Sequence, residues 1–171
     1  AAHGHGFDHR SFTAAGLHDG AKRAGAHTGE VPLRVTDDVS EVGQQPTPLG
    51  GRGPDGGERG VVSRMNPQVS FGDDVLARIG HAASCASCLD EMRLAVVQEV
   101  SGMIDALCAG AGIGREHIYE VTFAGNTTMQ QILCGIDPSP LGELPFTPAF
   151  RQALEAHAAD LHLHAHPRAK V

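Results

Sequence analysis

A short turn is the strongest candidate for chemistry in this sequence. Gly125, Asn126, Thr127 and Thr128 follow an apolar run, residues 121–123, and precede apolar residues at helical spacing. We therefore expect a strand, a tight turn and a helix start, an arrangement that presents backbone N–H groups to a ligand. The turn could face an anion or a bound water in a nucleotide cleft. It could equally be a helix N-cap with threonine hydroxyls bonded back to the backbone.

Two adjacent carboxylates, Asp73 and Asp74, form a second candidate site. Mg²⁺ prefers carboxylates and waters, so the pair could hold this ion through water. Both also fall in the first turn of a predicted helix capped by Ser70, where acidic side chains suit the helix dipole, and we prefer that structural interpretation. Arg78 follows Asp74 by one turn and is expected to pair with it.

The four cysteines are Cys85, Cys88, Cys108 and Cys134. The first two form a CxxC, a spacing that suits zinc or a redox pair. There is one such motif and no strand-to-helix redox context, so a structural role is preferred. Without a secretory signal in the sequence, reduced thiols and a cytoplasmic location are expected.

Histidines form two short clusters, and we assign no metal site to either. The clusters are His3, His5, His9 and His162, His164, His166. Such clusters bind Ni²⁺ or Zn²⁺ weakly without this being the function. His117, beside a predicted strand, is expected at the surface.

Alternating elements must position these residues. We predict a strand over 59–65, a helix from about residue 73, a strand over 117–125 and a helix over 127–133. A long helix is predicted from about Ser87 to Ala109, because apolar residues recur every three or four positions: Leu89, Met92, Val96, Val100, Met103, Ile104 and Leu107. A last helix is predicted over 147–164, with Thr147 as cap and Pro148 at its first position. The order indicates an α/β layer.

Residues 1–57 differ from the rest of the chain. They show no apolar periodicity, and residues 41–57 are rich in glycine and proline. We interpret 1–57 as disordered, with at most one short element near residues 31–39, or as translated out of the native reading frame. Residues 58–171 are then the folded unit.

Composition excludes several partners. Apolar residues make up 41% of the 171, enough for a core, but aromatic residues only 4%. The net charge of −7 argues against nucleic acid, which needs a basic face. No apolar stretch looks long enough to span a membrane, so no membrane partner is expected.

Two long motifs, over residues 66–79 and 123–150, resemble the reductive activators of corrinoid proteins, which are ATP-dependent members of the actin-like ATPase superfamily. The matching positions in the first motif are Asn66, Pro67, Gln68, Phe71, Gly72, Asp74, Val75, Arg78 and Ile79. Those in the second are Gly125, Asn126, Thr127, Thr128, Met129, Gly135, Ile136, Asp137, Pro138, Leu141, Pro145, Phe146 and Pro148. The resemblance covers roughly residues 58–171.

The resemblance implies a fold, cofactors and a partner. The fold would be a partial actin-like (ribonuclease H-like) lobe, with helices on a small, incomplete sheet. Full-length members use ATP with Mg²⁺ and a [2Fe–2S] domain to reduce the inactive cobalt of a corrinoid protein. This chain lacks the four-cysteine run of such a domain. It also lacks recognisable phosphate loops, so we expect an inactive internal fragment that binds no cofactor by itself.

The alternative is a non-enzymatic binding module, with weak histidine-mediated metal binding. A homodimer is considered under either reading. A self-sufficient module should unfold cooperatively, whereas a fragment should unfold over a broad range and bind hydrophobic dyes.

Overall fold

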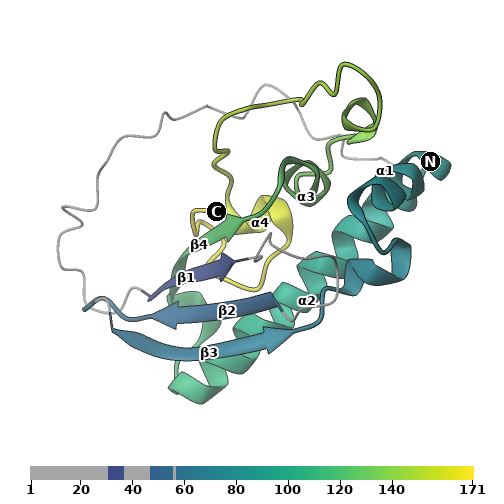
Figure 1. Ribbon diagram of the computed structural model, residues 1–171. Helices are drawn as coiled ribbons and strands as arrows, with labels where there is room; N and C mark the ends of the chain where they lie inside the picture. The colour runs from purple at the N-terminus through teal and green to yellow at the C-terminus, as the bar shows by residue number, and fades with distance from the viewer. Residues whose placement is uncertain (1–30, 37–46, 56) are drawn as a thin grey trace, which may run out of the picture.

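The computed structural model describes residues 31–36, 47–55 and 57–171, which form a four-stranded sheet with helices packed on it (Figure 1). The strands are β1 (Val31–Thr36), β2 (Thr47–Arg52), β3 (Glu58–Arg64) and β4 (Ile118–Ala124), in the spatial order β3-β2-β1-β4. β2 is antiparallel to both β1 and β3, whereas β4 runs parallel to β1. The predicted α/β class is confirmed.

β2 corrects the expectation for residues 1–57. It forms within the glycine- and proline-rich run, where no strand was predicted. Leu49 is fully buried and lies opposite Val62 of β3, so pairing and burial outweigh the poor strand propensity of its neighbours. β1 is the one short element expected near residues 31–39, whereas β2 was not expected, and most of the other residues before Glu58 lie outside the described ones.

The β2–β3 turn is held by its own polar groups. The Gly57 N–H donates to Asp55 Oδ1 at 3.0 Å, and Arg59 pairs with Asp55 Oδ2 at 2.9 Å. The bond from Gly57, assisted by Arg59, lowers the pKa of the Asp55 carboxyl.

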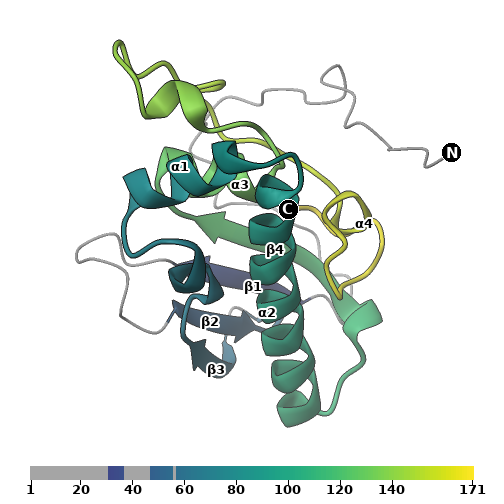
Figure 2. The same cartoon turned by 90° about the vertical axis from the view of Figure 1, so that its right-hand side faces the viewer.

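The long helix α2 (Cys88–Ala111) lies across the sheet, as Figure 2 shows. The predicted apolar stripe faces the core, and its most buried members include Met92, Met103 and Ile104. The helix ends at Gly112, whose left-handed backbone (φ 67°) fits the expected glycine C-cap.

α2 also corrects the view that no stretch could span a membrane. α2 is long and apolar enough to do so by length and composition, and an 18-residue stretch of it has a mean hydropathy of 1.3. Its apolar side packs on Leu49, Ile118 and Val121 of the sheet, and a core helix passes the same test.

The first motif folds into a 3-10 turn, η1 (Pro67–Phe71), and the helix α1 (Val75–Ser84). The predicted cap is shifted: Asp74, not Ser70, caps α1, and its Oδ1 accepts from the Ala77 N–H at 2.7 Å. The Ser70 hydroxyl instead donates to the Pro67 carbonyl.

The second motif includes α3 (Thr127–Leu133) and the 3-10 turn η3 (Ser139–Leu141). A further 3-10 turn, η2 (Arg115–His117), leads into β4. The β4–α3 unit agrees with the predicted strand and helix to within one residue.

The predicted last helix is wrong, because only α4 (Ala158–Leu161) forms. The Ala156 N–H donates to the Val171 carbonyl and Val171 returns the bond, both at 2.9 Å. The Ala158 N–H donates to the Ala169 carbonyl, also at 2.9 Å. Pairing with the last residues thus takes up the backbone groups that a longer helix would need.

Candidate functional site

The two motifs meet at a small apolar cavity of about 50 Å³ beside the end of β4. Asn66, Pro67 and Gln68 line it from the first motif, and Gly125 and Met129 from the second. α2 supplies the floor through Val96, Val100 and Met103. Arg64 and Glu99, which also line the cavity, form an ion pair at 3.5 Å.

The predicted turn between β4 and α3 is an N-cap. Asn126 Oδ1 accepts from the Met129 N–H at 3.0 Å, and Gln130 Nε2 donates to the Gly125 carbonyl at 2.9 Å. Thr128 is buried, whereas Thr127 is exposed. The structural interpretation therefore holds for Asn126, and Thr127 is the turn's most accessible hydroxyl for a ligand.

Asp73 and Asp74 lie on the surface and do not line the cavity. One oxygen of Asp74 is engaged by the cap of α1. Arg78 is buried, and its Nε donates to the Gly72 carbonyl at 3.1 Å while Nη1 approaches Met129 Sδ at 3.5 Å. Arg78 thus joins the two motifs, a role that its spacing from Asp74 did not indicate.

The remaining residues of the first motif shape the corner before α1. Asn66 caps η1, because its side-chain oxygen accepts a hydrogen bond from the Gln68 N–H. The Gln68 side chain is fully buried, and its Nε2 donates to the Met92 carbonyl. Phe71 packs against the ring of His81, with centroids 5.0 Å apart. At Gly72 a β-carbon would lie 2.8 Å from Ala77 Cβ, so the turn requires glycine.

The later residues of the second motif build the loop after α3. Gly135 takes a left-handed conformation (φ 67°) beyond the helix end. Asp137 Oδ1 accepts from the backbone and hydroxyl of Ser139, and Pro138 is buried. Pro145 and Phe146, which belong to the second motif, are exposed in this loop.

Two buried polar side chains escaped the sequence analysis. Gln131 in α3 is fully buried and its Oε1 accepts from the Ala149 N–H at 3.3 Å, which fixes the loop. Arg93 in α2 donates to the carbonyls of Leu133 and Asp160. Both residues stand beside apolar residues at helical spacing. This position is the sequence signal that could have indicated their burial.

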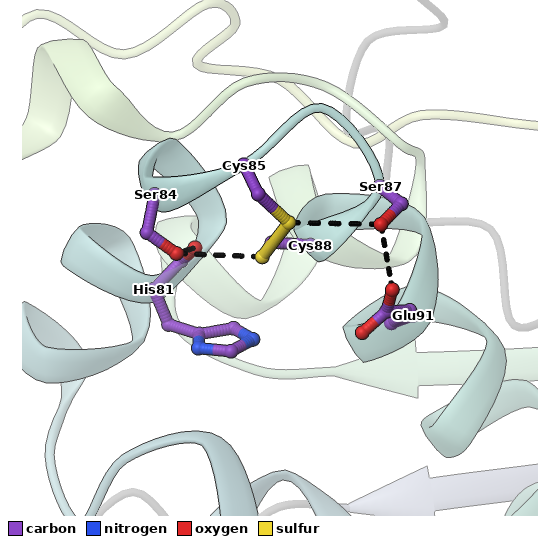
Figure 3. The surroundings of a disulfide bond; sticks show 6 residues. All are labelled: His81, Ser84, Cys85, Ser87, Cys88 and Glu91. Atoms are coloured by element: carbon purple, nitrogen blue, oxygen red, sulfur yellow. Dashed lines mark hydrogen bonds between the residues drawn. A yellow bond between two sulfur atoms is a disulfide. The ribbon is translucent and has the colours of Figure 1, made fainter.

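The cysteines depart from the expected reduced state. Cys85 and Cys88 are joined in a disulfide (Figure 3). Cys108 and Cys134 are free and buried. Burial raises the pKa of both free thiols. At Cys134 the positive charge of Arg93 opposes this effect, and at Cys108 the carboxylates of Asp105 and Glu116 add to it.

The second histidine cluster does not gather around one point. His164 Nδ1 bonds to Asp105 at 2.8 Å, and the ring of His166 stacks on Tyr119. Within 31–36, 47–55 and 57–171, no three histidine, cysteine or acidic side chains could hold one metal ion. His117 is exposed, as expected, and His3, His5 and His9 lie outside the described residues.

The implied cofactors do not fit these residues alone. A [2Fe–2S] cluster needs four convergent thiolates, and here two sulfurs are bonded together while the other two are buried on separate elements. In the described part of the chain the turn offers one exposed hydroxyl, at Thr127, toward a nucleotide. A complete nucleotide site therefore needs groups beyond these.

The sequence of the chain matches a known family. A family model described as the RACo middle region matches residues 54–171, and the chain belongs to this family. The resemblance to reductive activators of corrinoid proteins is confirmed.

Two relatives carry informative names. The corrinoid activation enzyme RamQ of Eubacterium limosum is 29% identical over 109 residues, which are 64% of this chain and 18% of RamQ. A solved reductive activator for corrinoid, iron–sulfur protein matches with a TM-score of 0.78 and 26% identity, over 88% of this chain and 23% of that one. The chain thus spans about a fifth of the length of each relative.

Proposed function

We propose that this chain is the middle part of an actin-like ATPase lobe in an ATP-dependent reductive activator of corrinoid proteins. The match of the RACo middle region over residues 54–171 carries the proposal. The names of RamQ and of the solved activator support it, since both act in corrinoid activation. The partner would be a corrinoid protein, and the location the cytoplasm.

The chain's own part in this function is positional. Arg78 fixes α1 against α3, and Asn126 fixes the start of α3, so the Thr127 hydroxyl has a defined place at the end of β4. In the longer activator, Thr127 would contact a nucleotide phosphate or its bound water, and the Asp73–Asp74 pair would contact water around Mg²⁺. An iron–sulfur group elsewhere in the activator would supply the electron for cobalt.

A chimera tests the proposal. Residues 54–171 replace the matching region of RamQ, and cobalt reduction in a corrinoid protein is followed by absorbance with and without ATP. We expect ATP-dependent reduction. A folded chimera that neither hydrolyses ATP nor reduces cobalt, beside an active intact RamQ, would contradict the proposal.

Thr127→Val in the same chimera separates ligand contact from folding. Thr127 is exposed and its side chain makes no hydrogen bond within the described part of the chain, so stability should change by less than about 0.5 kcal/mol. If the hydroxyl contacts phosphate or its water, ATP turnover should fall roughly tenfold or more. Thr122→Val, at an exposed position of β4, is the matched control.

We also propose that two copies associate through the loop that follows η3. Leu144 and Phe146 are 83% and 53% exposed there, more than large apolar side chains usually are.

A further inference from the structure

We propose that Cys85 and Cys88 form a redox-active dithiol–disulfide pair that exchanges electrons with thiols of the glutathione class. This site lies at the corner between α1 and α2, outside the cavity lining, and the inference goes beyond the proposed function. Cys85 is the residue after α1, Cys88 is the first residue of α2, and their Cα atoms are 5.2 Å apart.

The two sulfurs differ in access. Cys85 is exposed, whereas Cys88 is only 6% exposed beneath it. An external thiolate therefore reaches Cys85 Sγ and not Cys88 Sγ. This asymmetry of one accessible and one covered sulfur is what an ordered, two-step exchange requires.

The surroundings also accommodate the reduced form. Ser84 Oγ lies 3.3 Å from Cys88 Sγ, and Ser87 Oγ lies 3.6 Å from Cys85 Sγ (Figure 3). Each serine already gives its own proton away, Ser84 to the His81 carbonyl and Ser87 to Glu91 Oε1. The serine oxygens are thus left as acceptors, which two thiol protons would fill on reduction.

The helix favours the leaving sulfur. Cys88 opens α2, a helix of 24 residues, so the positive end of the helix dipole lies at this sulfur. A thiolate released there is stabilised, and stabilised thiolates leave faster.

The exchange balances as a two-electron reaction. A thiolate attacks Cys85 Sγ, the Cys85–Cys88 bond breaks, and Cys88 leaves as a thiolate that takes a proton. A second thiolate attacks the sulfur of the bound small thiol, which releases the oxidised small disulfide and the Cys85 thiolate. The protein disulfide and two thiols thus become a protein dithiol and one small disulfide.

A redox titration tests the proposal on the whole chain. The chain is equilibrated in buffers of different reduced-to-oxidised glutathione ratio, acid-quenched and alkylated, and the peptide with residues 85–88 is weighed by mass spectrometry. We expect one transition with the same midpoint from the reduced and from the oxidised side. A pair that stays fully reduced or fully oxidised at every ratio overturns the proposal.

Single replacements test the order of attack. Cys88→Ser should accumulate a glutathione adduct on Cys85, whereas Cys85→Ser should leave Cys88 unmodified in the folded protein. Equal modification of the two variants, with native circular dichroism, contradicts the assigned asymmetry. Adding Cys108→Ala/Cys134→Ala to each variant removes the two other thiols, so that any modification falls on Cys85 or Cys88.

The serines test the acceptor role. Ser87→Ala removes no capping bond from α2 but removes the acceptor beside Cys85, so the exchange constant should shift several-fold toward the disulfide. Ser84→Ala should act in the same direction at Cys88. Ser63→Ala, an exposed serine of β3, is the control, and serine variants that behave like it overturn the acceptor role.

Discussion

Gly72 is a residue at which close packing leaves no room for a side chain. In Gly72→Ala the new β-carbon would lie 2.8 Å from Ala77 Cβ and 2.9 Å from the Arg78 nitrogen, so the start of α1 must shift. We expect a loss of about 1–3 kcal/mol in the free energy of unfolding by urea titration.

Gly80→Ala, inside α1, is the control for a glycine with open space around it. A β-carbon at Gly80 meets nothing within 4 Å, and alanine favours a helix interior by roughly 0.5–1 kcal/mol. This variant should be as stable as the parent or more so. Equal changes in the two variants would mean that contact with Ala77 does not decide the effect.

Arg78 is the residue through which the two motifs touch. A lysine at this position carries the charge but not the guanidinium fork that reaches both Gly72 and Met129. Arg78→Lys should reduce the free energy of unfolding by about 1–3 kcal/mol. Arg151→Lys, at an exposed position, should change it by less than about 0.5 kcal/mol, and parity between the two would refute the bridging role.

The free thiols predict a loss of stability in alkali. Burial raises the pKa of Cys108 and Cys134 in the folded chain, so the unfolded chain ionises first. Their contribution is complete below the unfolded thiol pKa, about 8.5, and is lost as pH rises through the higher folded values.

The measurement is the urea midpoint at about pH 7.5 and about pH 9.5, on either side of the unfolded thiol pKa. We expect a fall in the parent and a smaller one in Cys108→Ala/Cys134→Ala, because the other groups that respond to alkali are present in both. An identical fall in the double variant would assign the effect to those other groups.

At the scale of elements, α3 depends on one side chain at its start. Asn126→Ala removes the bond from the Met129 N–H and should cost about 1 kcal/mol of unfolding free energy. Asn126→Asp keeps an acceptor at the cap and should be near neutral in the same urea titration. A similar loss for aspartate would show that the amide makes another contact.

Elements were predictable where local signals and burial agree. The β4–α3 unit has β-branched and aromatic residues, then an asparagine cap, and its boundaries follow from residues 118–133 alone. β2 was not predictable, because Leu49 becomes a core residue only when β3 lies beside it. The helix expected after Thr147 was lost in the same way, since residues 156–158 pair with 169–171.

In the candidate site, too, some contacts could be predicted from the sequence and others could not. Asn126 as a cap follows from sequence, since asparagine before an apolar stripe is a strong local signal. The contact between Arg78 and Met129 spans elements far apart in the chain, and no spacing rule reveals it. The Cys85–Cys88 spacing suited zinc or a redox pair, but a structural role was preferred, because the distances from the two serine oxygens to the sulfurs appear only in three dimensions.

At the scale of the whole molecule, apolar surface stays open on the described part of the chain. Val61 of β3 is 52% exposed, and Leu144 and Phe146 are exposed on the loop after η3. Because these side chains make few contacts, their removal should leave the fold intact. Leu144→Ser/Phe146→Ser should therefore change the urea midpoint little while lowering the fluorescence of a bound hydrophobic dye.

Sedimentation velocity then decides what the loop surface does. If two copies pair through it, the parent should sediment as a dimer at high concentration and the double variant as a monomer. Val61→Ser is the control for an exposed apolar residue elsewhere and should leave association unchanged. If the parent stays monomeric and the double variant loses binding to a corrinoid protein, the surface contacts that partner. A dimer that persists in the double variant would exclude the loop as the interface.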